Sequence, residues 1–491
     1  MSNYGIHWFR RDLRVAGNQA LQSHWKANQG RVLGLFCFDK AFLSRPDFSV
    51  NRFQLFIDSL YELKMELREL GSDLLFLDVG PEKSFPKLIK ALDKQGQLPH
   101  LFTWNRDYEP FARKRDRAIE ELMMDFGVPT ETFRDHLLIE PQELEKSPGE
   151  GYQVYSPFAR KWLEIYQKPD IQRRIQMQKA GLSYLQKRLK GDVAPVFNFT
   201  WEELFDGKIP FDDWLEDYRK KNQEKVTVPI PPAGSLNAFK KLKEFKRKVS
   251  DYGDQRDVPI LEGTSQLSMH LKSGSITIPQ IIAFFQLKAY KKKKTGEDIF
   301  LSELIWREFY YHILYRHPRV ENEAFLEKYK DIEWENNEDR FMAWKEGKTG
   351  FPIVDAGMRE LKSTGWMHNR VRMIVASFLT KDLLIDWRWG EKYFMDQLLD
   401  GDLAPNNGGW QWAASTGCDP QPYFRIFNPW LQSKKFDPQG DYIKKFVPEL
   451  KDLPAKQLHE PIENHPTYPR PIVDHSEQRE KALALYKFEQ A

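Results

Sequence analysis

The sequence predicts an α/β domain with a doubly wound parallel sheet, followed by a long connecting segment and an all-α domain. Over the first 135 residues short β-rich runs alternate with amphipathic stretches, the pattern loosens from 136 to 235, and apolar spacing is helical from 236 to 491. Alternation of strands and helices is typical of parallel sheets with right-handed crossovers. We therefore expect three parts, at residues 1–135, 136–235 and 236–491.

Four apolar runs in the first part are the expected strands: YGIHWF, VLGLFCFD, LLFLDV and LFTWN. Residues 53–70 predict a helix packed on the sheet, because their apolar side chains fall on one stripe. No GxGxxG sequence follows the first run, so the phosphate-binding turn of a Rossmann domain is not predicted.

The middle part contains helical pieces interrupted by SPGEG, VAPVF and VPIPPAG, as expected of a long connection. In the last part apolar residues recur at helical spacing, for example at Leu301, Leu304, Ile305, Phe309 and Ile313, and no clear strand is visible. Nine of the fifteen Trp residues lie between positions 300 and 430, so the function has to explain this concentration of indoles.

Composition narrows the class of protein. With 491 residues, of which 41% are hydrophobic, the chain can bury more than one core. Cys37 and Cys418 lie far apart and outside any CxxC or Cys/His pattern, so we expect no disulfide framework and no metal site. Charges interrupt the N-terminal apolar run and no stretch of eighteen apolar residues follows. We expect a soluble, cytoplasmic protein with no membrane span.

The net charge of +3 hides a basic segment: residues 236–300 hold thirteen Lys or Arg against seven Asp or Glu. Such a surface could face a polyphosphate such as DNA. It could equally be a solvated helix face and a charged loop, so charge alone leaves both interpretations open.

Two segments have the composition of a ligand site. Residues 400–412, DGDLAPNNGGWQW, bring together carboxylates, carboxamides, adjacent glycines and two indoles, Trp410 and Trp412. Adjacent glycines allow close approach of the backbone to a flat ligand and indoles offer stacking faces, which indicates a cofactor wall. Residues 262–268, EGTSQLS, place hydroxyls before a helical pattern, where they either cap the helix or leave its N–H groups to a phosphate.

Two further segments combine planar and ionic groups. ELIWREFY places Glu303 and Trp306 on one helix face, where the indole is either a core residue or a stacking surface beside a carboxylate. In GWMHNRVRM we expect Arg372 to bind an acid such as Asp400, which leaves Arg370 free for a phosphate.

Seven segments, in this order, resemble those of the photolyase/cryptochrome flavoproteins: WFRRDLR, WNRDYEPFARKRD, EGTSQLS, ELIWREFY, GWMHNRVRM, DGDLAPNNGGWQW and YFRIFNP. They span nearly the whole chain and are most similar to the bacterial class I cyclobutane pyrimidine dimer photolyases. The resemblance implies an N-terminal α/β domain, a connecting segment and a helical domain that holds FAD. It also implies a monomer that binds damaged DNA, single- or double-stranded.

The resemblance implies a carbon–carbon lyase reaction: light-driven electron transfer from reduced FAD splits pyrimidine dimers that are flipped out of DNA. Asn406 would face the central ring of the flavin, where plant cryptochromes carry Asp, so this residue favours a repair enzyme. The positions that match FAD ligands are Tyr252, Thr264, Ser265, Gln266, Leu267, Ser268, Arg372, Asp400, Gly401, Asp402 and Asn406.

The resemblance implies a dimer pocket lined by Glu303, Trp306, Asn369, Met373 and Trp412. The two indoles would sandwich the pyrimidines and Glu303 would bind their carbonyl edge. The (6-4) photolyases carry two His residues in the segment that matches GWMHNRVRM and Gln at the position of Glu303, so dimer repair is favoured. A cryptochrome-type blue-light photoreceptor and a flavoprotein that binds DNA structurally stay as alternatives.

Two more sets of residues follow from the resemblance. An electron-transfer chain to the flavin would consist of Trp410, Trp387 and Trp334. The phosphates that flank the lesion would contact Arg256, Arg307, Arg370 and Arg425.

Members of the family also hold a light-harvesting antenna pigment between the domains, and the matching positions are Asp39, Arg52, Asp107, Glu109 and Lys272. Asp107 and Lys272 resemble the type that binds 8-hydroxy-5-deazaflavin, whereas Glu109 also fits the type that binds 5,10-methenyltetrahydrofolate. The segment HPRVENEAF lacks the Lys of the folate pattern, so deazaflavin is favoured slightly.

Overall fold

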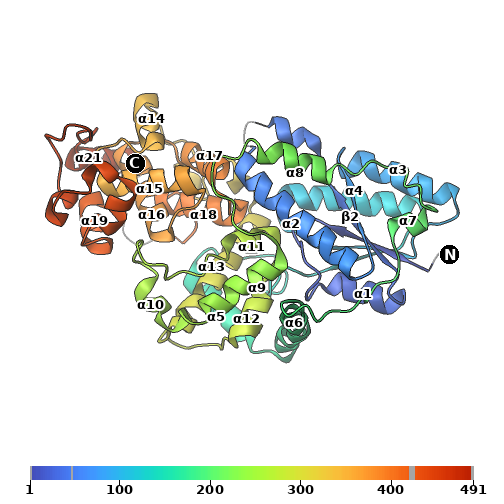
Figure 1. Ribbon diagram of the computed structural model, residues 1–491. Helices are drawn as coiled ribbons and strands as arrows, with labels where there is room; N and C mark the ends of the chain where they lie inside the picture. Colours follow the sequence, from blue (N-terminus) through green and yellow to red (C-terminus); the bar gives the residue numbers. More distant parts are fainter. Residues whose placement is uncertain (1–2, 46–47, 420–425, 488–491) are drawn as a thin grey trace.

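The computed structural model describes residues 3–45, 48–419 and 426–487. An α/β half and a helical half lie side by side (Figure 1). The α/β half contains a five-stranded parallel sheet of order β3-β2-β1-β4-β5. Its strands are β1 (Gly5–Phe9), β2 (Val32–Cys37), β3 (Leu74–Leu77), β4 (Leu101–Asn105) and β5 (Thr130–Phe133). The predicted fold class and the four predicted strands are confirmed.

Strand β5 escaped the sequence prediction. Its sequence, TETF, lies at the edge of the sheet and is only partly buried, so the apolar run that marks the other four strands is missing. The continuous apolar sequences of β1 to β4 fit strands covered by helices on both faces.

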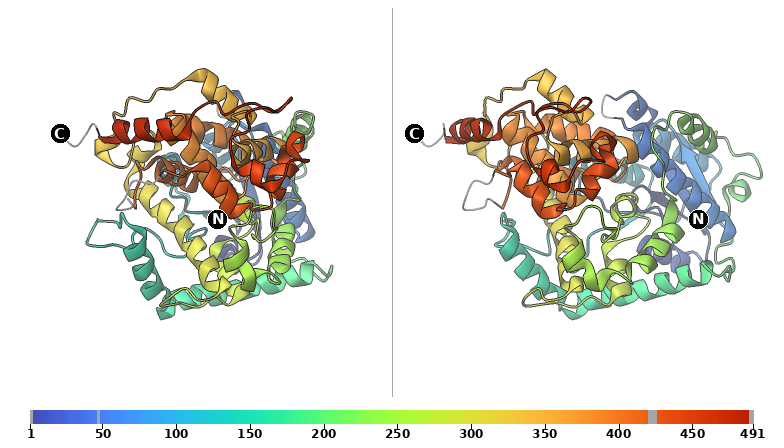
Figure 2. Two further views of the ribbon diagram at one scale, coloured as in Figure 1. Left: turned by 90° about the vertical axis from the view of Figure 1, so that its left-hand side faces the viewer. Right: turned by 60° about the vertical axis from the view of Figure 1, so that its left-hand side comes forward.

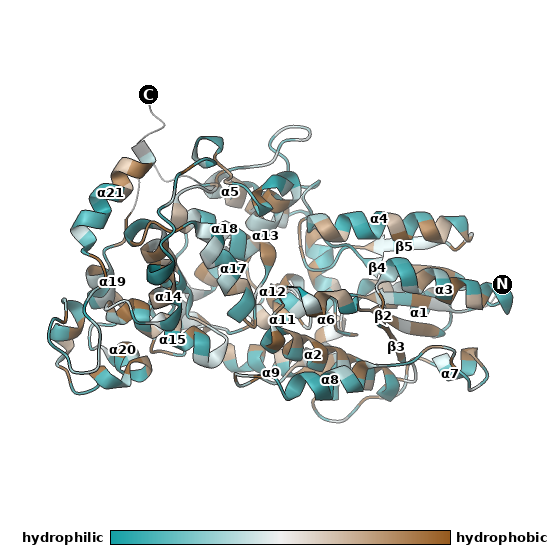
Figure 3. Cartoon of the chain, turned by 90° about the horizontal axis from the view of Figure 1, so that it is seen from above, coloured by the Kyte–Doolittle hydropathy of each residue, from teal (hydrophilic) through white to brown (hydrophobic). Residues whose placement is uncertain are grey.

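Helices cover both faces of the sheet. α1 (Gln19–Ala27) and α2 (Val50–Glu69) pack on one face, and α3 (Pro81–Lys94) and α4 (Pro110–Asp125) pack on the other. Figure 3 shows the apolar strands enclosed between these helices. The stripe predicted for residues 53–70 is confirmed, because Phe53, Ile57, Leu60, Leu63 and Leu67 are all buried on the sheet.

The order of the strands reverses beside β1. The chain moves from β1 to β2 and β3 on one side, and then returns to add β4 and β5 on the other side. In register, Gly5 of β1 pairs with Val32 of β2 and with Leu101 of β4. In open α/β sheets such a reversal leaves a crevice at the carboxyl ends of the strands, where ligands bind.

The segment between the two halves is well packed. It contains α5 (Tyr155–Tyr166), α6 (Pro169–Arg188), α7 (Trp201–Leu204) and α8 (Leu215–Gln223). Helix α6 runs along the lower edge of the molecule beneath both halves (Figure 2). Phe158 and Trp162 of α5 join the core of the helical half, whereas Trp201 donates a hydrogen bond of 2.8 Å from Nε1 to the Gly34 carbonyl inside the sheet. This segment therefore joins the two halves through buried contacts. The domain bounds given above stay a prediction.

From residue 234 onward the described chain is helical. Helix α13 begins with a capping box in which Thr295 and Asp298 each bond to the other's backbone N–H. Among the described residues no helix is long and apolar enough to cross a bilayer. The helices are α9 (Gly234–Phe245), α10 (Tyr252–Gln255), α11 (Ser268–Ser273), α12 (Ile278–Phe285), α13 (Gly296–Arg316), α14 (Glu338–Glu346), α15 (Pro352–Thr364), α16 (Asn369–Ser377), the π-helix η5 (Phe378–Asp382), α17 (Trp387–Gln397), α18 (Leu403–Ala414), α19 (Pro429–Phe436), α20 (Asp441–Phe446) and α21 (His475–Lys487).

Candidate active site and antenna cavity

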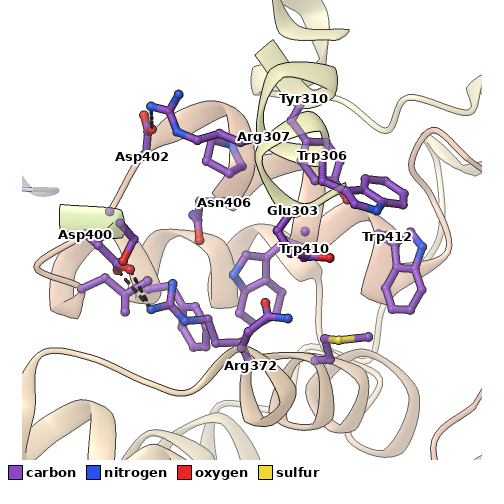
Figure 4. Close-up of a pocket in the computed structure, with 18 of the residues that line it drawn as sticks. Glu303, Trp306, Arg307, Tyr310, Arg372, Asp400, Asp402, Asn406, Trp410 and Trp412 are labelled. Atoms are coloured by element: carbon purple, nitrogen blue, oxygen red, sulfur yellow. Dashed lines mark hydrogen bonds and ion pairs between the residues drawn. The ribbon is translucent and has the colours of Figure 1, made fainter. Parts of the chain in front are cut away.

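A cavity of about 520 Å³ lies between α13, α16 and α18 in the helical half, and we call it the helical cavity (Figure 4). It brings together all five residues predicted for the dimer pocket and most of those predicted for the flavin ring. The predicted residues that line it are Arg256, Ser268, Glu303, Trp306, Arg307, Asn369, Arg372, Met373, Asp400, Gly401, Asp402, Asn406, Trp410 and Trp412.

Helix α13 supplies one wall through regular spacing. Glu303, Trp306, Arg307 and Tyr310 stand three, four and seven residues apart, so they share one face of the helix and all line the cavity. Sequence reasoning missed Tyr310, although its position four residues after Trp306 was a usable signal. The carboxylate and the indole predicted to share a helix face do so.

Glu303 has a cationic partner. Its Oε1 lies 2.5 Å from Nη1 of Arg256, which comes from the segment after α10. Burial by itself would lower the pKa of Arg256, but the adjacent Glu303 outweighs it and holds that pKa above its ordinary value. The cavity thus contains a partly buried ion pair.

Arg372 and Arg370 differ in their partners. Arg372 donates to both oxygens of Asp400, at 2.9 and 3.1 Å, as predicted. The expectation that Arg370 stays free was wrong, because its Nη2 lies 2.8 Å from Asp257. Asp257 and Arg370 are 113 residues apart in the chain, so this proximity could not be read from the sequence.

The opposite wall of the cavity is the first half of α18. Asn406 donates from Nδ2 to the carbonyl of Glu391 on α17, at 3.2 Å, while the neighbouring Asn407 donates to the Glu391 carboxyl at 3.0 Å. Burial raises the pKa of Glu391 to about 8, so this acid is mainly neutral at pH 7. The Asn406 carboxamide is therefore anchored on one side by the Glu391 backbone carbonyl, and the nearby Glu391 carboxyl carries little charge.

The two adjacent glycines of α18 have different structural roles. A Cβ on Gly408 would lie 2.0 Å from Cδ1 of Tyr310, so Gly408 lets α18 approach α13. A Cβ on Gly409 would meet nothing within 4 Å, and Gly409 lines the cavity. Only Gly409 matches the expectation of room for a flat ligand.

The indoles predicted to carry electrons are buried to different degrees. Trp410 is 2% exposed, lines the cavity and packs edge-on against Phe394 at 4.9 Å between ring centroids. Trp387 is 1% exposed at the start of α17, and Trp334 is only partly buried. In contrast to Trp410, Trp412 is partly exposed and stands near Trp306 at one side of the cavity (Figure 4).

The segment before α11 does not cap its helix with a hydroxyl. Leu267 occupies the N-cap position and makes no side-chain capping bond, so of the two alternatives the structure contradicts capping. Ser268 lines the cavity, whereas residues 264–267 and Tyr252 lie outside its lining. Tyr252 packs edge-on against Phe245 and Phe300.

A second cavity, of about 420 Å³, lies at the carboxyl ends of the strands, and we call it the switch-point cavity. All five residues predicted for the antenna line it: Asp39, Arg52, Asp107, Glu109 and Lys272. Sequence reasoning missed Arg10 and Arg11, which follow β1 directly, and the aromatic side chains of Phe36, Phe38, Phe42, Phe48, Phe53, Phe56 and Phe111. Their position directly after a parallel strand was the signal from which the two Arg residues could have been predicted.

Asp402 lies between the two cavities. Its carboxylate lies 3.1 Å from Lys272, 3.1 Å from Arg307 and 3.4 Å from Arg11, and it accepts a bond of 2.6 Å from the Tyr311 hydroxyl. Burial would raise the pKa of Asp402, but the three cations lower it well below its usual value. Lys272 and Arg11 line the switch-point cavity, whereas Asp402 and Arg307 line the helical cavity. One buried charge network therefore separates the cavities.

Arg307 and Arg425 are two of the residues predicted to contact phosphates. The Arg307 guanidinium is engaged by Asp402 and by the Leu271 carbonyl, on the side of the cavity that faces the α/β half. Arg425 lies outside the described residues. Among the described residues no group of three His, Cys, Asp or Glu side chains is placed to hold a metal ion.

The architecture thus combines an α/β half and a helical half with the two cavities described above. Residues 5–176 match the DNA photolyase family, and residues 300–488 match the FAD binding domain of DNA photolyase. The chain is 38% identical over 490 residues to the deoxyribodipyrimidine photo-lyase of Vibrio cholerae, covering 98% of each chain. It is also 38% identical over 491 residues to that of Escherichia coli, again covering 98% of each.

Solved structures of two photolyases are similar to this chain over nearly its whole length. A class III photolyase from Agrobacterium tumefaciens has a TM-score of 0.82 at 33% identity, covering 100% of this chain and 98% of that one. An archaeal photolyase from Sulfolobus tokodaii, which contains two FAD molecules, has a TM-score of 0.76 at 31% identity, covering 98% and 99%. The chain belongs to the DNA photolyase family, and it carries that family's FAD-binding domain.

The helical cavity fits FAD. Its volume lies within the range of roughly 300–1,000 Å³ that is usual for ligand pockets. The side of Gly409 that faces the cavity is open, as close approach of a planar ring requires. Nη1 of Arg307, which lines the same cavity, is buried without a protein partner among the described residues, so the wall has a donor to offer a polar cofactor.

Proposed function

We propose that this protein is a light-driven DNA repair enzyme that splits cyclobutane pyrimidine dimers flipped out of DNA. The observation that carries the proposal is the helical cavity, in which Glu303, Trp306, Asn369, Met373 and Trp412 line the same space as the residues proposed to hold FAD. Its relatives of about 38% identity are named deoxyribodipyrimidine photo-lyases. The reaction is a carbon–carbon lyase reaction with no net oxidation or reduction.

When bound and reduced, FAD supplies the light-excited electron that starts ring opening. Arg372 and Asp400 hold each other beside the ring site, so a cation and an anion are fixed before the cofactor arrives. Asn406 presents a neutral carboxamide, anchored through Glu391, to the central ring. Ser268 and residues 264–267 hold the pyrophosphate near α11, whose first N–H groups have no side-chain cap.

The substrate side of the cavity positions the dimer. Trp306 and Trp412 stack on the linked pyrimidines, and such stacking contributes about 1–3 kcal/mol per base. Glu303 accepts a hydrogen bond from the ring N–H at the carbonyl edge of the dimer, and the adjacent Arg256 favours the extra electron. Extrusion of the lesion costs a few kcal/mol, least for a damaged pair, so the two stacks offset most of that cost.

Dimer specificity rests on two positions in α16. Asn369 and Met373 line the cavity, and neither side chain can act as the acid–base group that a (6-4) photoproduct needs. A cryptochrome-type photoreceptor is the alternative function. The Asn at position 406 favours repair over that alternative.

Electrons reach the flavin from the protein surface through Trp334, Trp387 and Trp410 in our proposal. Support comes from their burial, because Trp334 is partly exposed, Trp387 is buried, and Trp410 is buried in the cavity wall. Of the four Arg residues predicted to contact lesion-flanking phosphates, Arg256, Arg370 and Arg425 keep that role in our proposal, whereas Arg307 is held by Asp402 and the Leu271 carbonyl beside the cofactor. Arg370 now pairs with Asp257, so DNA binding exchanges this partner for a phosphate, whereas Arg256 has further N–H donors for a phosphate while it stays beside Glu303.

The switch-point cavity holds the antenna pigment in our proposal. Its aromatic lining suits a planar chromophore, and Asp39, Asp107, Glu109 and Lys272 offer charged contacts. We favour 8-hydroxy-5-deazaflavin over 5,10-methenyltetrahydrofolate. The Sulfolobus tokodaii photolyase, which contains two FAD molecules, implies a novel light-harvesting cofactor in that protein, so the absorption spectrum decides. We further propose a cytoplasmic monomer.

The decisive experiment uses purified protein with reduced FAD and an oligonucleotide that contains one thymine dimer. Blue light should restore the pyrimidines, and a dark sample is the control. Absence of recovery with FAD present would remove the proposed function. Glu303→Ala should still bind the dimer but repair it with a lower quantum yield, whereas an unchanged yield would remove Glu303 from the mechanism.

A further inference from the structure

The face of Trp306 that is turned away from the helical cavity is covered by Tyr155, the first residue of α5. The ring centroids lie 3.6 Å apart and the planes are within 5° of parallel. Trp306 lines the cavity, whereas Tyr155 lies outside the lining and is only 7% exposed. One face of the indole is therefore occupied by protein, and the other is left for a ligand.

Tyr155 is held at both ends. Its hydroxyl lies 3.0 Å from the Ser302 carbonyl oxygen and 2.8 Å from Ser302 Oγ, and its backbone N–H donates to Asp419 at 3.0 Å. Asp419 in turn donates its backbone N–H to the carbonyl of Gln153 at 2.9 Å and lines the cavity itself. The position of the Tyr155 ring is thus fixed by α13 and by the rim of the cavity.

A partly exposed indole has two side-chain torsions, and stacking on a base requires both to be fixed. Binding is stronger when the protein fixes them before the ligand arrives, because less freedom is lost on association. A buried ring parallel to Trp306 restricts both torsions. Among the described ring contacts, Trp306 is the one cavity-lining side chain that stacks parallel to Tyr155.

We propose that Tyr155 is a positioning residue for lesion recognition, which holds the Trp306 indole parallel to the damaged pyrimidines. The inference rests on the proposed dimer repair and extends it to the segment between the two halves. Tyr155 acts through Trp306 and does not touch the substrate.

The test compares Tyr155→Leu with Tyr155→Phe in the FAD-loaded protein. Phe keeps the stack and loses only the bonds to Ser302, whereas Leu removes the flat face. In the dark, Tyr155→Leu should bind a dimer-containing oligonucleotide about tenfold more weakly, or about 1.4 kcal/mol, with unchanged affinity for undamaged DNA. Tyr155→Phe should stay within about twofold of the wild type. If Tyr155→Leu loses FAD or melts early, Tyr155→Met takes its place with the same expected loss.

A double-mutant cycle asks whether the effect passes through the indole. In a Trp306→Ala background, Tyr155→Leu should change dimer affinity by less than about twofold. A tenfold loss in both backgrounds, or an equal loss in Tyr155→Phe and Tyr155→Leu, would overturn the proposal. If the wild type itself does not prefer dimer-containing DNA, the proposed function is refuted. If the wild type prefers such DNA and Tyr155→Leu keeps the same preference, only this inference is refuted.

Discussion

The two cavities of this protein are built in opposite ways. The helical cavity takes most of its polar side chains from α13, α16 and α18, with four lining residues on one face of α13. The switch-point cavity takes its charged side chains mainly from loops that follow β1, β2 and β4. A helix fixes the spacing of its own side chains, whereas loop residues meet only because parallel strands end at the same edge of the sheet. Local sequence motifs therefore predict the lining of the helical cavity, whereas the lining of the switch-point cavity depends on the topology of the sheet.

The cavities also differ in the state of their buried acids. In the switch-point cavity, burial would raise the pKa of Asp107, but Arg11 holds it well below its usual value. Behind the helical cavity, burial raises the pKa of Glu391 to about 8. Charged acids thus lie between the two halves, where cations from both converge, and a largely neutral acid lies behind the proposed flavin site.

The largest effect should follow Asp402→Ala, because it removes the anion that both cavities share. Three cations would stay buried without their common partner, and breaking a buried ion pair in this way costs about 3–5 kcal/mol. Urea unfolding should show a loss of that size, accompanied by loss of FAD. The matched control is Glu120→Ala at an exposed position of α4, which should change stability by less than about 0.5 kcal/mol. Equal stability of the two variants would mean that the network does not join the halves.

The next effect concerns Glu391. Its pKa in the folded protein is about 8 and that of an ordinary Glu is about 4.5, so the folded state holds the proton more tightly. The resulting stability is present below pH 4.5 and is lost as the pH rises towards 8. Relative to Glu391→Gln, which stays neutral, the wild type should lose about 3–4 kcal/mol of unfolding free energy between pH 5 and pH 8. Parallel pH profiles for the two proteins would show that Glu391 is ionised throughout.

A smaller effect should be confined to the switch-point cavity. Asp39 accepts a bond from the Ala41 N–H at 3.0 Å and caps the short 3₁₀ turn Lys40–Ser44. Asp39→Asn keeps that cap and removes the charge, so it should weaken retention of the antenna pigment about tenfold, the loss of one charge-assisted hydrogen bond. The pigment's absorption band should fall while the FAD bands stay. The control is Asp58→Asn, an acid of α2 that pairs with Arg219 outside the cavity; loss of the band in both would contradict the assignment.

The smallest effect belongs to the basic run that precedes α13. Lys293 lies over the Tyr155 ring, with Nζ 6.0 Å from its centroid, close to the ion pair of Glu303 and Arg256. If this run faces DNA, Lys293→Ala should weaken binding severalfold for damaged and undamaged DNA alike and lower the salt slope by about one. Lys90→Ala, on α3 of the α/β half, is the control and should leave the slope unchanged. Equal slopes for all three proteins would favour the solvated-loop interpretation.

The sequence predicted much of the molecule because local patterns carried the information. Apolar runs marked four strands, and the fifth was missed because its edge position left it polar. The dense motifs of α13, α16 and α18 contained the five residues of the proposed dimer pocket. Contacts between segments were harder to predict. Arg370 was expected to be free and binds Asp257, and Gly408 was expected to face a ligand and instead accommodates Tyr310.

By itself the sequence determined the fold class, because strand and helix periodicity are local properties of the chain. It also indicated the family through seven segments that resemble the photolyases, and that resemblance implied the residues proposed to face the flavin and the dimer. Only the tertiary structure decided which distant groups share a wall. Tyr155 reaches Trp306, and Asp402 reaches Arg11 and Lys272, across gaps of more than one hundred residues. These contacts depend on how whole elements pack, and packing is settled by the burial of many side chains at once, which no short segment of the sequence records.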